Sequence, residues 1–269
     1  RDIHHLTPSA GVHHLLNDLC ARIQATLSAR LSGLYLFGSL VTGDFDLHSS
    51  DLDLLAVTST ELDADMFARL FAMHVGFTRA YPEWDDRVEV VYMSARALAT
   101  FRTQRSDIAV ISPGEPFHSK DAGDDWLVNW YVVRERGIAL YGPPPTALIG
   151  PITFAEYVAG VRDYALDWRE RIEQMHSRRA QAYAILTMCR AYYTLREGVF
   201  ASKLQAALWA ERLWPEWSSL IMQALRWRSE QRDAPVDHVA ALAQTRRFVQ
   251  FAAEQCEAAT LPPQATPAL

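Results

Sequence analysis

The chain has 269 residues, of which 49 % are hydrophobic and 22 % are charged, and its formal net charge is −6 at pH 7. This length fits one large or two ordinary domains, and the composition is that of an ordinary globular protein. The negative charge argues against a nucleic-acid-binding protein, whose surface is usually basic, and it suits a cationic substrate better. No stretch is apolar enough to span a membrane and no signal peptide opens the chain, so we expect a cytoplasmic protein.

The first third of the chain predicts a helix followed by two strands. Apolar residues recur at helical spacing over residues 9–30, which indicates an amphipathic helix. Residues 34–37 form a short, bulky apolar run that ends on Gly38-Ser39, and residues 52–57 form a second apolar run. Short apolar runs bounded by Gly and Ser are typical of buried strands.

Two aspartates stand at the start of the second strand. Because residues i and i+2 of a strand share a face, roughly 6.5–7 Å apart at Cα, Asp51 and Asp53 direct two carboxylates at one spot. Carboxylates this close repel unless a cation lies between them, and Mg²⁺ is usually held by one or two carboxylates together with substrate phosphates. Gly38 lets the backbone approach a phosphate closely, and Ser39 and Ser50 add hydroxyl donors. The pattern therefore predicts a site for Mg²⁺ and a phosphate-bearing ligand.

The middle of the chain predicts a helix, a third strand and a turn. Residues 61–76 indicate a helix that ends at Gly76. The alternating apolar residues of 88–92 indicate a strand on which Glu89 points to the opposite face. Residues 108–118 contain a short apolar run that enters a Pro-Gly turn. On sequence alone, Glu89 is either a catalytic carboxylate or an exposed strand residue.

The remainder of the chain is expected to be helical. Residues 122–137 predict a helix, and the three prolines at 143–145 mark a boundary between domains. Beyond Ile152 we find no convincing strand. The helices predicted there span residues 154–171, 178–196, 202–213, 217–228 and 236–258.

These elements define the expected fold class. We expect an α/β domain with a small mixed sheet over residues 1–145 and an all-α helical bundle over residues 150–260. The last residues, 261–269, are rich in proline and alanine and are expected to form a disordered tail.

The motif between the first two strands resembles a known signature. Gly38-Ser39, an eleven-residue gap and Asp51-Leu52-Asp53 resemble the signature of the polymerase-β-like nucleotidyltransferase superfamily. Within that superfamily, residues 36–55 look most like the streptomycin and spectinomycin adenylyltransferases. The resemblance implies an α/β nucleotidyltransferase domain in which Gly38-Ser39 holds a triphosphate and Asp51 and Asp53 hold magnesium. The alternative is an acidic turn between two strands, but the joint pattern is more specific than an Asp-x-Asp alone.

The resemblance also implies roles for residues further along the chain. It implies that Glu89 joins the metal site and acts as the base that removes a proton from an acceptor hydroxyl. Asp125 matches an aspartate that contacts the nucleotide, although a charge at a helix N-terminus is an equally simple reading. Arg190 and Lys203 match an arginine and a lysine that reach the nucleotide phosphates from the helical domain.

The resemblance implies Mg²⁺-dependent transfer of AMP from ATP to a hydroxyl of a small aminocyclitol or aminoglycoside-like acceptor. Residues 169–178 do not match the family's drug-binding residues one for one, so Trp168, Glu170 and Glu173 are candidates only. Two alternatives remain open. One is a nucleotidyltransferase that acts on a protein partner, antitoxin-like or regulatory. The other is a non-catalytic, nucleotide-binding relative.

Overall fold

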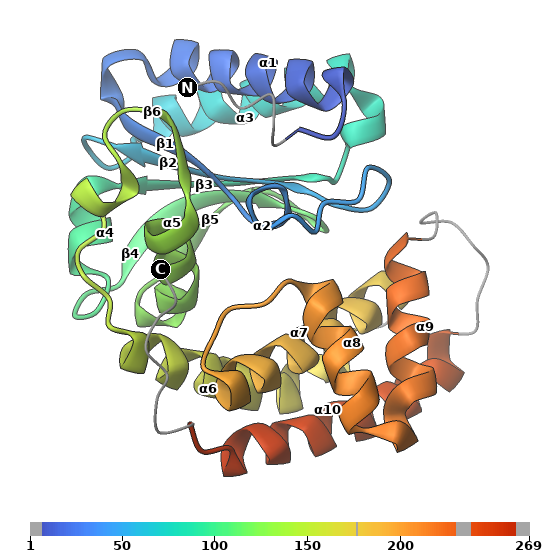
Figure 1. Ribbon diagram of the computed structural model, residues 1–269. Coiled ribbons are helices and arrows are strands. Elements are labelled where there is room, and N and C mark those ends of the chain that lie inside the picture. Colours follow the sequence, from blue (N-terminus) through green and yellow to red (C-terminus); the bar gives the residue numbers. More distant parts are fainter. Residues whose placement is uncertain (1–6, 176, 230–237, 262–269) are drawn as a thin grey trace. The chain divides into compact units, whose positions relative to one another are not determined.

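The computed structural model describes residues 7–175, 177–229 and 238–261. The chain divides between Ile152 and Thr153 into two compact units. The first unit contains strands and helices, and the described part of the second unit contains helices only (Figure 1). The predicted fold class, an α/β unit followed by an all-α unit, is confirmed. The disordered tail expected at the C-terminus lies, from residue 262 on, outside the described residues.

The first unit is built on one mixed sheet. Its strands are β1 (Leu31–Phe37), β2 (Leu52–Thr58), β3 (Val88–Ser94), β4 (Ser106–Ser112), β5 (Glu115–Ala122) and β6 (Ile138–Tyr141). They lie in the order β5-β4-β3-β2-β1-β6. Strands β2 and β3 are parallel, and the other neighbours are antiparallel. A parallel pair needs a crossover connection, and here it contains a helix.

Helices cover both faces of this sheet. They are α1 (Ala10–Leu27), α2 (Ser39–Thr42), α3 (Ala64–Ala80), α4 (Ala95–Thr100) and α5 (Leu127–Arg136). Figure 1 shows α1 and α3 over one face and α4 and α5 over the other. Two separate apolar clusters result, because successive strand residues point to opposite faces. Leu34 and Leu36 belong to the cluster beneath α1 and α3, whereas Tyr35 and Phe37 belong to the cluster that contains Trp130 of α5.

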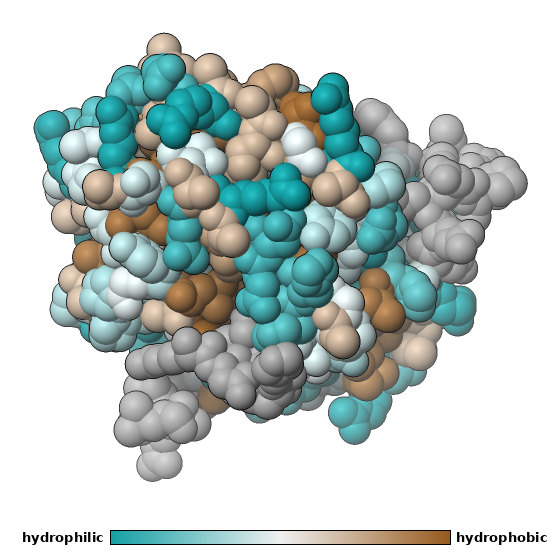
Figure 2. Space-filling model, turned by 90° about the horizontal axis from the view of Figure 1, so that it is seen from above, coloured by the Kyte–Doolittle hydropathy of each residue, from teal (hydrophilic) through white to brown (hydrophobic). Residues whose placement is uncertain are grey.

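The outer surface of the first unit agrees with this layering. Seen from the side of α1 and α3, hydrophilic side chains are spread over the surface among scattered hydrophobic ones (Figure 2). Helix α1 turns its apolar residues inward, since Leu16, Leu19 and Ile23 are fully buried. Its start is fixed by Ser9, whose hydroxyl accepts a hydrogen bond from the amide of Val12 at 3.2 Å.

One helix boundary predicted in this unit was wrong, whereas a predicted turn is observed. Helix α3 does not end at Gly76 but continues to Ala80, because Phe77 in its last turn is buried in the core. The Pro-Gly turn predicted within residues 108–118 is present, with Gly114 at φ +83°, and it connects β4 and β5 in a hairpin.

The helix predicted over residues 122–137 also begins later than expected. Residue 122 still belongs to β5, and a single 3₁₀ turn, Asp124–Trp126, precedes α5. Strand β5 escaped notice because it lies at the edge of the sheet and alternates poorly; among its residues only Phe117 and Ala122 are buried.

The second unit is a bundle of helices. The helices described are α6 (Phe154–Arg171), α7 (Arg178–Glu197), α8 (Lys203–Leu213), α9 (Ser218–Ser229) and α10 (His238–Ala258). Helix α7 is the central one, since it packs against the other four. It ends at Glu197, one residue beyond the predicted end, and is followed by Gly198 in a left-handed conformation at φ +69°. None of the helices in the described residues is both long and apolar enough to cross a membrane.

A buried polar pair connects α3 with the sheet. The Nε2 of His74 lies 2.8 Å from the hydroxyl of Tyr92 on β3, and both side chains are almost fully buried beside Phe117. Burial lowers the pKa of His74 to about 4, from an ordinary value of 6.5. The imidazole is therefore neutral near pH 7 and stays neutral well into the acid range.

Acidification should therefore weaken the fold through His74. Between pH 6.5 and about 4 the unfolded chain protonates His74 while the folded chain does not, so the free energy of unfolding should fall by up to about 3 kcal/mol. Urea unfolding at a series of pH values, followed for the wild type and for His74→Gln, measures this contribution. The variant should start less stable but lose less stability on acidification. An equal slope in both proteins would contradict the prediction.

Candidate active site

The Gly-Ser turn predicted to hold a phosphate connects β1 to the short helix α2. Gly38 has φ +72° and ψ −149°, a backbone conformation that is open essentially to glycine alone. Its carbonyl accepts hydrogen bonds from the amides of Val41 at 3.2 Å and Thr42 at 3.1 Å. A Cβ atom on Gly38 would lie 2.5 Å from the Cγ of Asp53, so the turn is packed directly against that carboxylate. Glycine is required here by both conformation and space.

The register of the sheet sets Asp53 beside Glu89. Asp53 is paired with Phe37 of β1 on one side and with Glu89 of β3 on the other. Residues in register on neighbouring strands point to the same face, and strands lie about 4.7–4.9 Å apart. Both carboxylates are partly exposed, whereas the residues before and after each of them are buried. The structure thus brings together two acidic residues that are far apart in sequence.

Asp51 lies just ahead of β2, two residues before Asp53, and is also partly exposed. The preceding Ser50 is different, because it is 4 % exposed and its hydroxyl accepts a hydrogen bond from the amide of Asp46 at 2.9 Å. The hydroxyl that the sequence suggested as a ligand donor therefore has a partner within its own loop.

That loop is held together by Asp46. Its carboxylate accepts hydrogen bonds from the amides of His48 and Ser49 and from the Ser49 hydroxyl, each at 2.9 Å. Burial acts to raise the pKa of Asp46, but these hydrogen bonds outweigh it, and the pKa lies below its ordinary value. Asp46 is therefore charged at neutral pH, and the loop that delivers Asp51 to the sheet is preformed.

The donor chemistry of this edge of the sheet fits a hard divalent cation. Asp51, Asp53 and Glu89 offer carboxylate oxygens, the ligands that Mg²⁺ prefers. Within the described residues, no group of three or more His, Cys, Asp or Glu side chains is already gathered so as to hold a metal ion. Mg²⁺ usually takes only one or two protein carboxylates and completes its shell with phosphate oxygens and water. The set therefore fits an ion that arrives together with a nucleotide.

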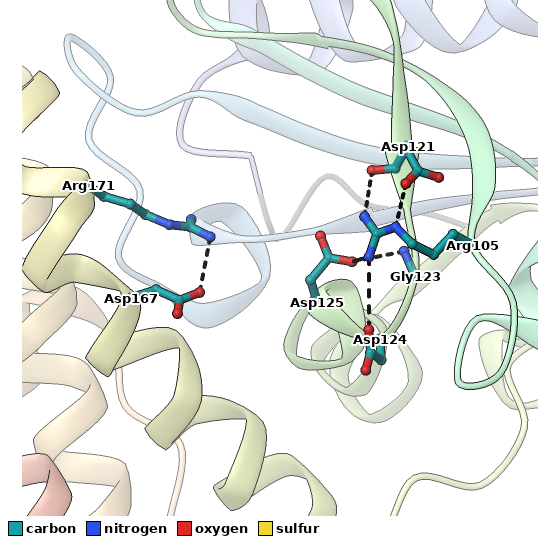
Figure 3. A network of polar contacts seen from close by, with 7 residues as sticks. All are labelled: Arg105, Asp121, Gly123, Asp124, Asp125, Asp167 and Arg171. Atoms are coloured by element: carbon teal, nitrogen blue, oxygen red, sulfur yellow. Dashed lines mark hydrogen bonds and ion pairs between the residues drawn. The ribbon is translucent and has the colours of Figure 1, made fainter.

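Asp125, a further predicted nucleotide contact in this unit, belongs to a polar network near the start of α5 (Figure 3). Its Oδ1 accepts hydrogen bonds from the Gly123 amide at 2.9 Å and from Nη1 of Arg105 at 3.0 Å. The Nε of Arg105 also donates to the carboxylate of Asp121. The Asp125 side chain is half-exposed, and its position is set by the turn and by Arg105.

The two predicted phosphate-binding cations lie in the second unit. Arg190 is partly exposed on α7, a helix whose middle is otherwise buried. Lys203 is the first residue of α8, and its Nζ lies 4.1 Å from the ring centre of Tyr183 on α7. That contact is a cation–π interaction, which orients the ammonium group at the surface of the bundle.

Sequence reasoning missed one residue of this region, Arg87. It is 8 % exposed, lies two residues before Glu89, and places its guanidinium 4.1 Å from the ring centre of Trp84. Its side chain donates to the carbonyls of Leu47 and Ser50. A tryptophan three residues before an arginine, at the entrance to a predicted strand, was the available signal.

Comparisons with known proteins all indicate a similarity to aminoglycoside adenylyltransferases. Residues 147–255 match the family described as the C-terminal domain of aminoglycoside adenylyltransferase. Proteins named aminoglycoside (3'') (9) adenylyltransferase from Klebsiella pneumoniae and Shigella flexneri are each 26 % identical to the chain over 239 residues, covering 83 % of this chain and 88 % of theirs. A protein of the same name from Escherichia coli is 26 % identical over 230 residues, covering 80 % of this chain and 84 % of its own.

A solved structure shares the fold. It is a spectinomycin adenyltransferase, AAD(9), from an Enterococcus, determined with ATP and spectinomycin. Its TM-score is 0.74 and the sequence identity is 16 %, with 91 % of this chain and 99 % of that chain covered. The likeness in sequence and the likeness in fold thus both extend over most of the chain.

The contact between Gly38 and Asp53 can be tested by a matched pair of substitutions at the two ends of α2. Gly43, at the other end, has φ +73° and ψ +20° and no atom within 4 Å of an added Cβ, so Gly43→Ala should cost only about 1 kcal/mol. Gly38→Ala should cost clearly more, because its conformation is rarer and the new methyl group overlaps Asp53. The midpoints of urea unfolding measure both costs. Equal midpoints would show that Asp53 does not pack against the turn.

Proposed function

This chain is an aminoglycoside adenylyltransferase-like nucleotidyltransferase, and on that premise we propose that it transfers AMP from ATP to a hydroxyl group of an aminoglycoside or aminocyclitol. The observation that carries the proposal is the pairing of β2 with β3, which sets Asp53 beside Glu89 at the Gly38 turn. Phosphoryl-transfer enzymes act chiefly by positioning and by electrostatics, and this arrangement offers both.

In the proposed reaction Glu89 acts as the general base. Its carboxylate takes the proton of the acceptor hydroxyl, and the oxygen attacks the α-phosphorus in line. The bond between the α-phosphorus and the bridging oxygen breaks, and pyrophosphate leaves with the electron pair. The partial exposure of Glu89 on a buried strand supports this role, because the carboxylate is held by a rigid element and still reaches solvent.

The carboxylates Asp51, Asp53 and Glu89 would hold Mg²⁺, which when bound neutralises phosphate charge and orients the triphosphate. The Gly38-Ser39 turn would contact the phosphates through backbone amides, with Ser50 stabilising the adjoining loop from within.

Further contacts would come from residues outside the turn. Asp125 would contact the nucleotide from the start of α5, where the Gly123 amide and Arg105 hold its carboxylate. Arg190 and Lys203 would offset the charge of the triphosphate and of the departing pyrophosphate.

The acceptor class is supported by the distribution of charge. Residues 1–152 hold 12 Lys and Arg against 19 Asp and Glu, a formal charge of −7, whereas residues 153–269 hold 14 against 13, a charge of +1. An acceptor that carries ammonium groups is attracted to an acidic surface, and the relatives are named for such acceptors. The second unit also matches the C-terminal family over most of its length, which favours this reading over a protein acceptor.

Removing the proposed base should abolish the reaction. Glu89→Gln is nearly isosteric but cannot accept the proton, so pyrophosphate release from Mg·ATP should fall by about 10²–10⁴-fold. The assay supplies spectinomycin, streptomycin and other aminocyclitols in turn, and mass spectrometry identifies the adenylylated product.

Asp85→Asn is the matched control. Asp85 is an exposed carboxylate just ahead of β3, and its substitution should leave the rate unchanged. Full activity of Glu89→Gln, or equal losses in the two variants, would reject Glu89 as the base. If the wild type binds Mg·ATP but releases no pyrophosphate with any of these compounds, a protein acceptor becomes the favoured alternative.

Lys203 should affect the nucleotide rather than the acceptor. Removing one cation from the triphosphate should lower kcat/KM for ATP by about tenfold or more in Lys203→Met, with little change in the KM for the acceptor. Arg212→Met is the control, since Arg212 lies exposed on the same helix and donates to the carbonyl of Leu208 at 3.1 Å. Steady-state kinetics with ATP varied separates the two. An equal effect in both variants would mean that only overall charge matters.

A further inference from the structure

Arg87 is a buried cation at the edge of the carboxylate set. Buried arginines are rare and are retained where their N–H groups have partners. Here Nη2 donates to the carbonyl of Ser50 at 2.6 Å and to the carbonyl of Leu47 at 2.9 Å, and Nε donates to Ser50 at 3.2 Å. The planar guanidinium packs over Trp84. One side chain thus donates hydrogen bonds to two backbone carbonyls of the loop between α2 and β2.

These contacts bracket Asp51. The carbonyl of Ser50, held by the Arg87 side chain, is bonded directly to the nitrogen of Asp51. On the other side, the amide of Leu52 donates to the backbone carbonyl of Arg87 at 3.0 Å. The ladder of β2 and β3 then continues with Leu52 opposite Val88. Arg87 therefore holds the chain immediately before and immediately after Asp51.

The same residue also sets the start of β3. Arg87 precedes Glu89 by two residues. The contacts of its side chain therefore also constrain the start of the strand that carries Glu89. The loop makes some apolar contacts of its own, since Phe45 packs on the core cluster and stacks on Trp84 with ring centres 6.5 Å apart, whereas Leu47 is 42 % exposed. Its internal hydrogen bonds, centred on Asp46, keep its shape but do not attach it to the sheet. The side-chain hydrogen bonds of Arg87 to the carbonyls of Leu47 and Ser50 connect this loop to the residue that precedes β3.

We propose that Arg87 is a positioning residue that fixes Asp51 at the start of β2, ahead of the paired Asp53 and Glu89, so that Asp51 is held in place for a divalent cation that arrives with a nucleotide. This inference rests on the proposed function, because it assigns Arg87 a role at the metal and nucleotide site of that reaction. Residues that orient metal ligands through hydrogen bonds typically change metal affinity or activity by about 10–100-fold when removed.

The test compares Arg87→Lys and Arg87→Met with the wild type. Lysine keeps the charge, but its single ammonium cannot reproduce the fork that grips Ser50 and Leu47 while stacking on Trp84. The first readout is binding of Mn²⁺, followed by electron paramagnetic resonance in the presence of a non-hydrolysable ATP analogue. The second is the Mg²⁺ concentration that gives half-maximal pyrophosphate release, with kcat and the acceptor KM measured separately.

We expect both variants to bind Mn²⁺ about 10–100-fold more weakly, to need more Mg²⁺ and to lose kcat, with the acceptor KM unchanged. Arg162→Met is the matched control for lost stability. Arg162 donates to the carbonyls of Cys256 at 3.3 Å and Ala259 at 2.8 Å, so it too grips two backbone carbonyls, but in the helical unit. This control should unfold at a lower temperature and keep the Mn²⁺ affinity of the wild type.

The outcomes separate the inference from the proposed function. The role of Arg87 is overturned if folded Arg87→Lys binds Mn²⁺ as tightly as the wild type, or if Arg162→Met loses as much affinity as the Arg87 variants. The proposed reaction still stands in that case, provided that the wild type is active and Asp53→Asn is not. If the wild type and Asp53→Asn bind Mn²⁺ equally and neither releases pyrophosphate with any acceptor, the proposed function fails and the role of Arg87 fails with it.

Discussion

The parallel pairing of β2 with β3 is the constraint on which the candidate site depends. A slip of one residue would turn Asp53 or Glu89 to the opposite face of the sheet. The apolar core prevents this slip from both sides. The pair Leu54 and Val90 lies in the cluster beneath α1 and α3, and the next pair, Leu55 and Val91, lies in the cluster beneath α5. The packing that stabilises the fold is therefore also what aligns the two carboxylates.

Charge is divided unequally between the two units, and this bears on how an anionic nucleotide is held. The net charge of the first unit, −7, disfavours the approach of a triphosphate unless backbone amides or a bound cation offset it. The cations assigned to the phosphates, Arg190 and Lys203, come from the second unit.

Local patterns predicted most of the fold and much of the candidate site. The glycine at position 38, the two aspartates and the buried strands all leave a signal within a few residues. Strand β5 did not, because an edge strand lacks apolar alternation. The contacts of Arg87 were also invisible, since an arginine that grips carbonyls some 40 residues away imposes no pattern on either segment. Likewise, nothing near Asp125 indicates that Arg105 holds it.

The crossover between β2 and β3 has a consequence for the order in which the protein assembles. The 35 residues between Asp53 and Glu89, including all of α3, must be arranged before the two carboxylates meet, whereas β1 with β2 and β4 with β5 pair as neighbours along the chain. Closing the longer loop costs more chain entropy, and long-range parallel pairing is intrinsically slow. During synthesis β1 and β2 emerge before β3, so this pair can form before Glu89 is brought beside Asp53.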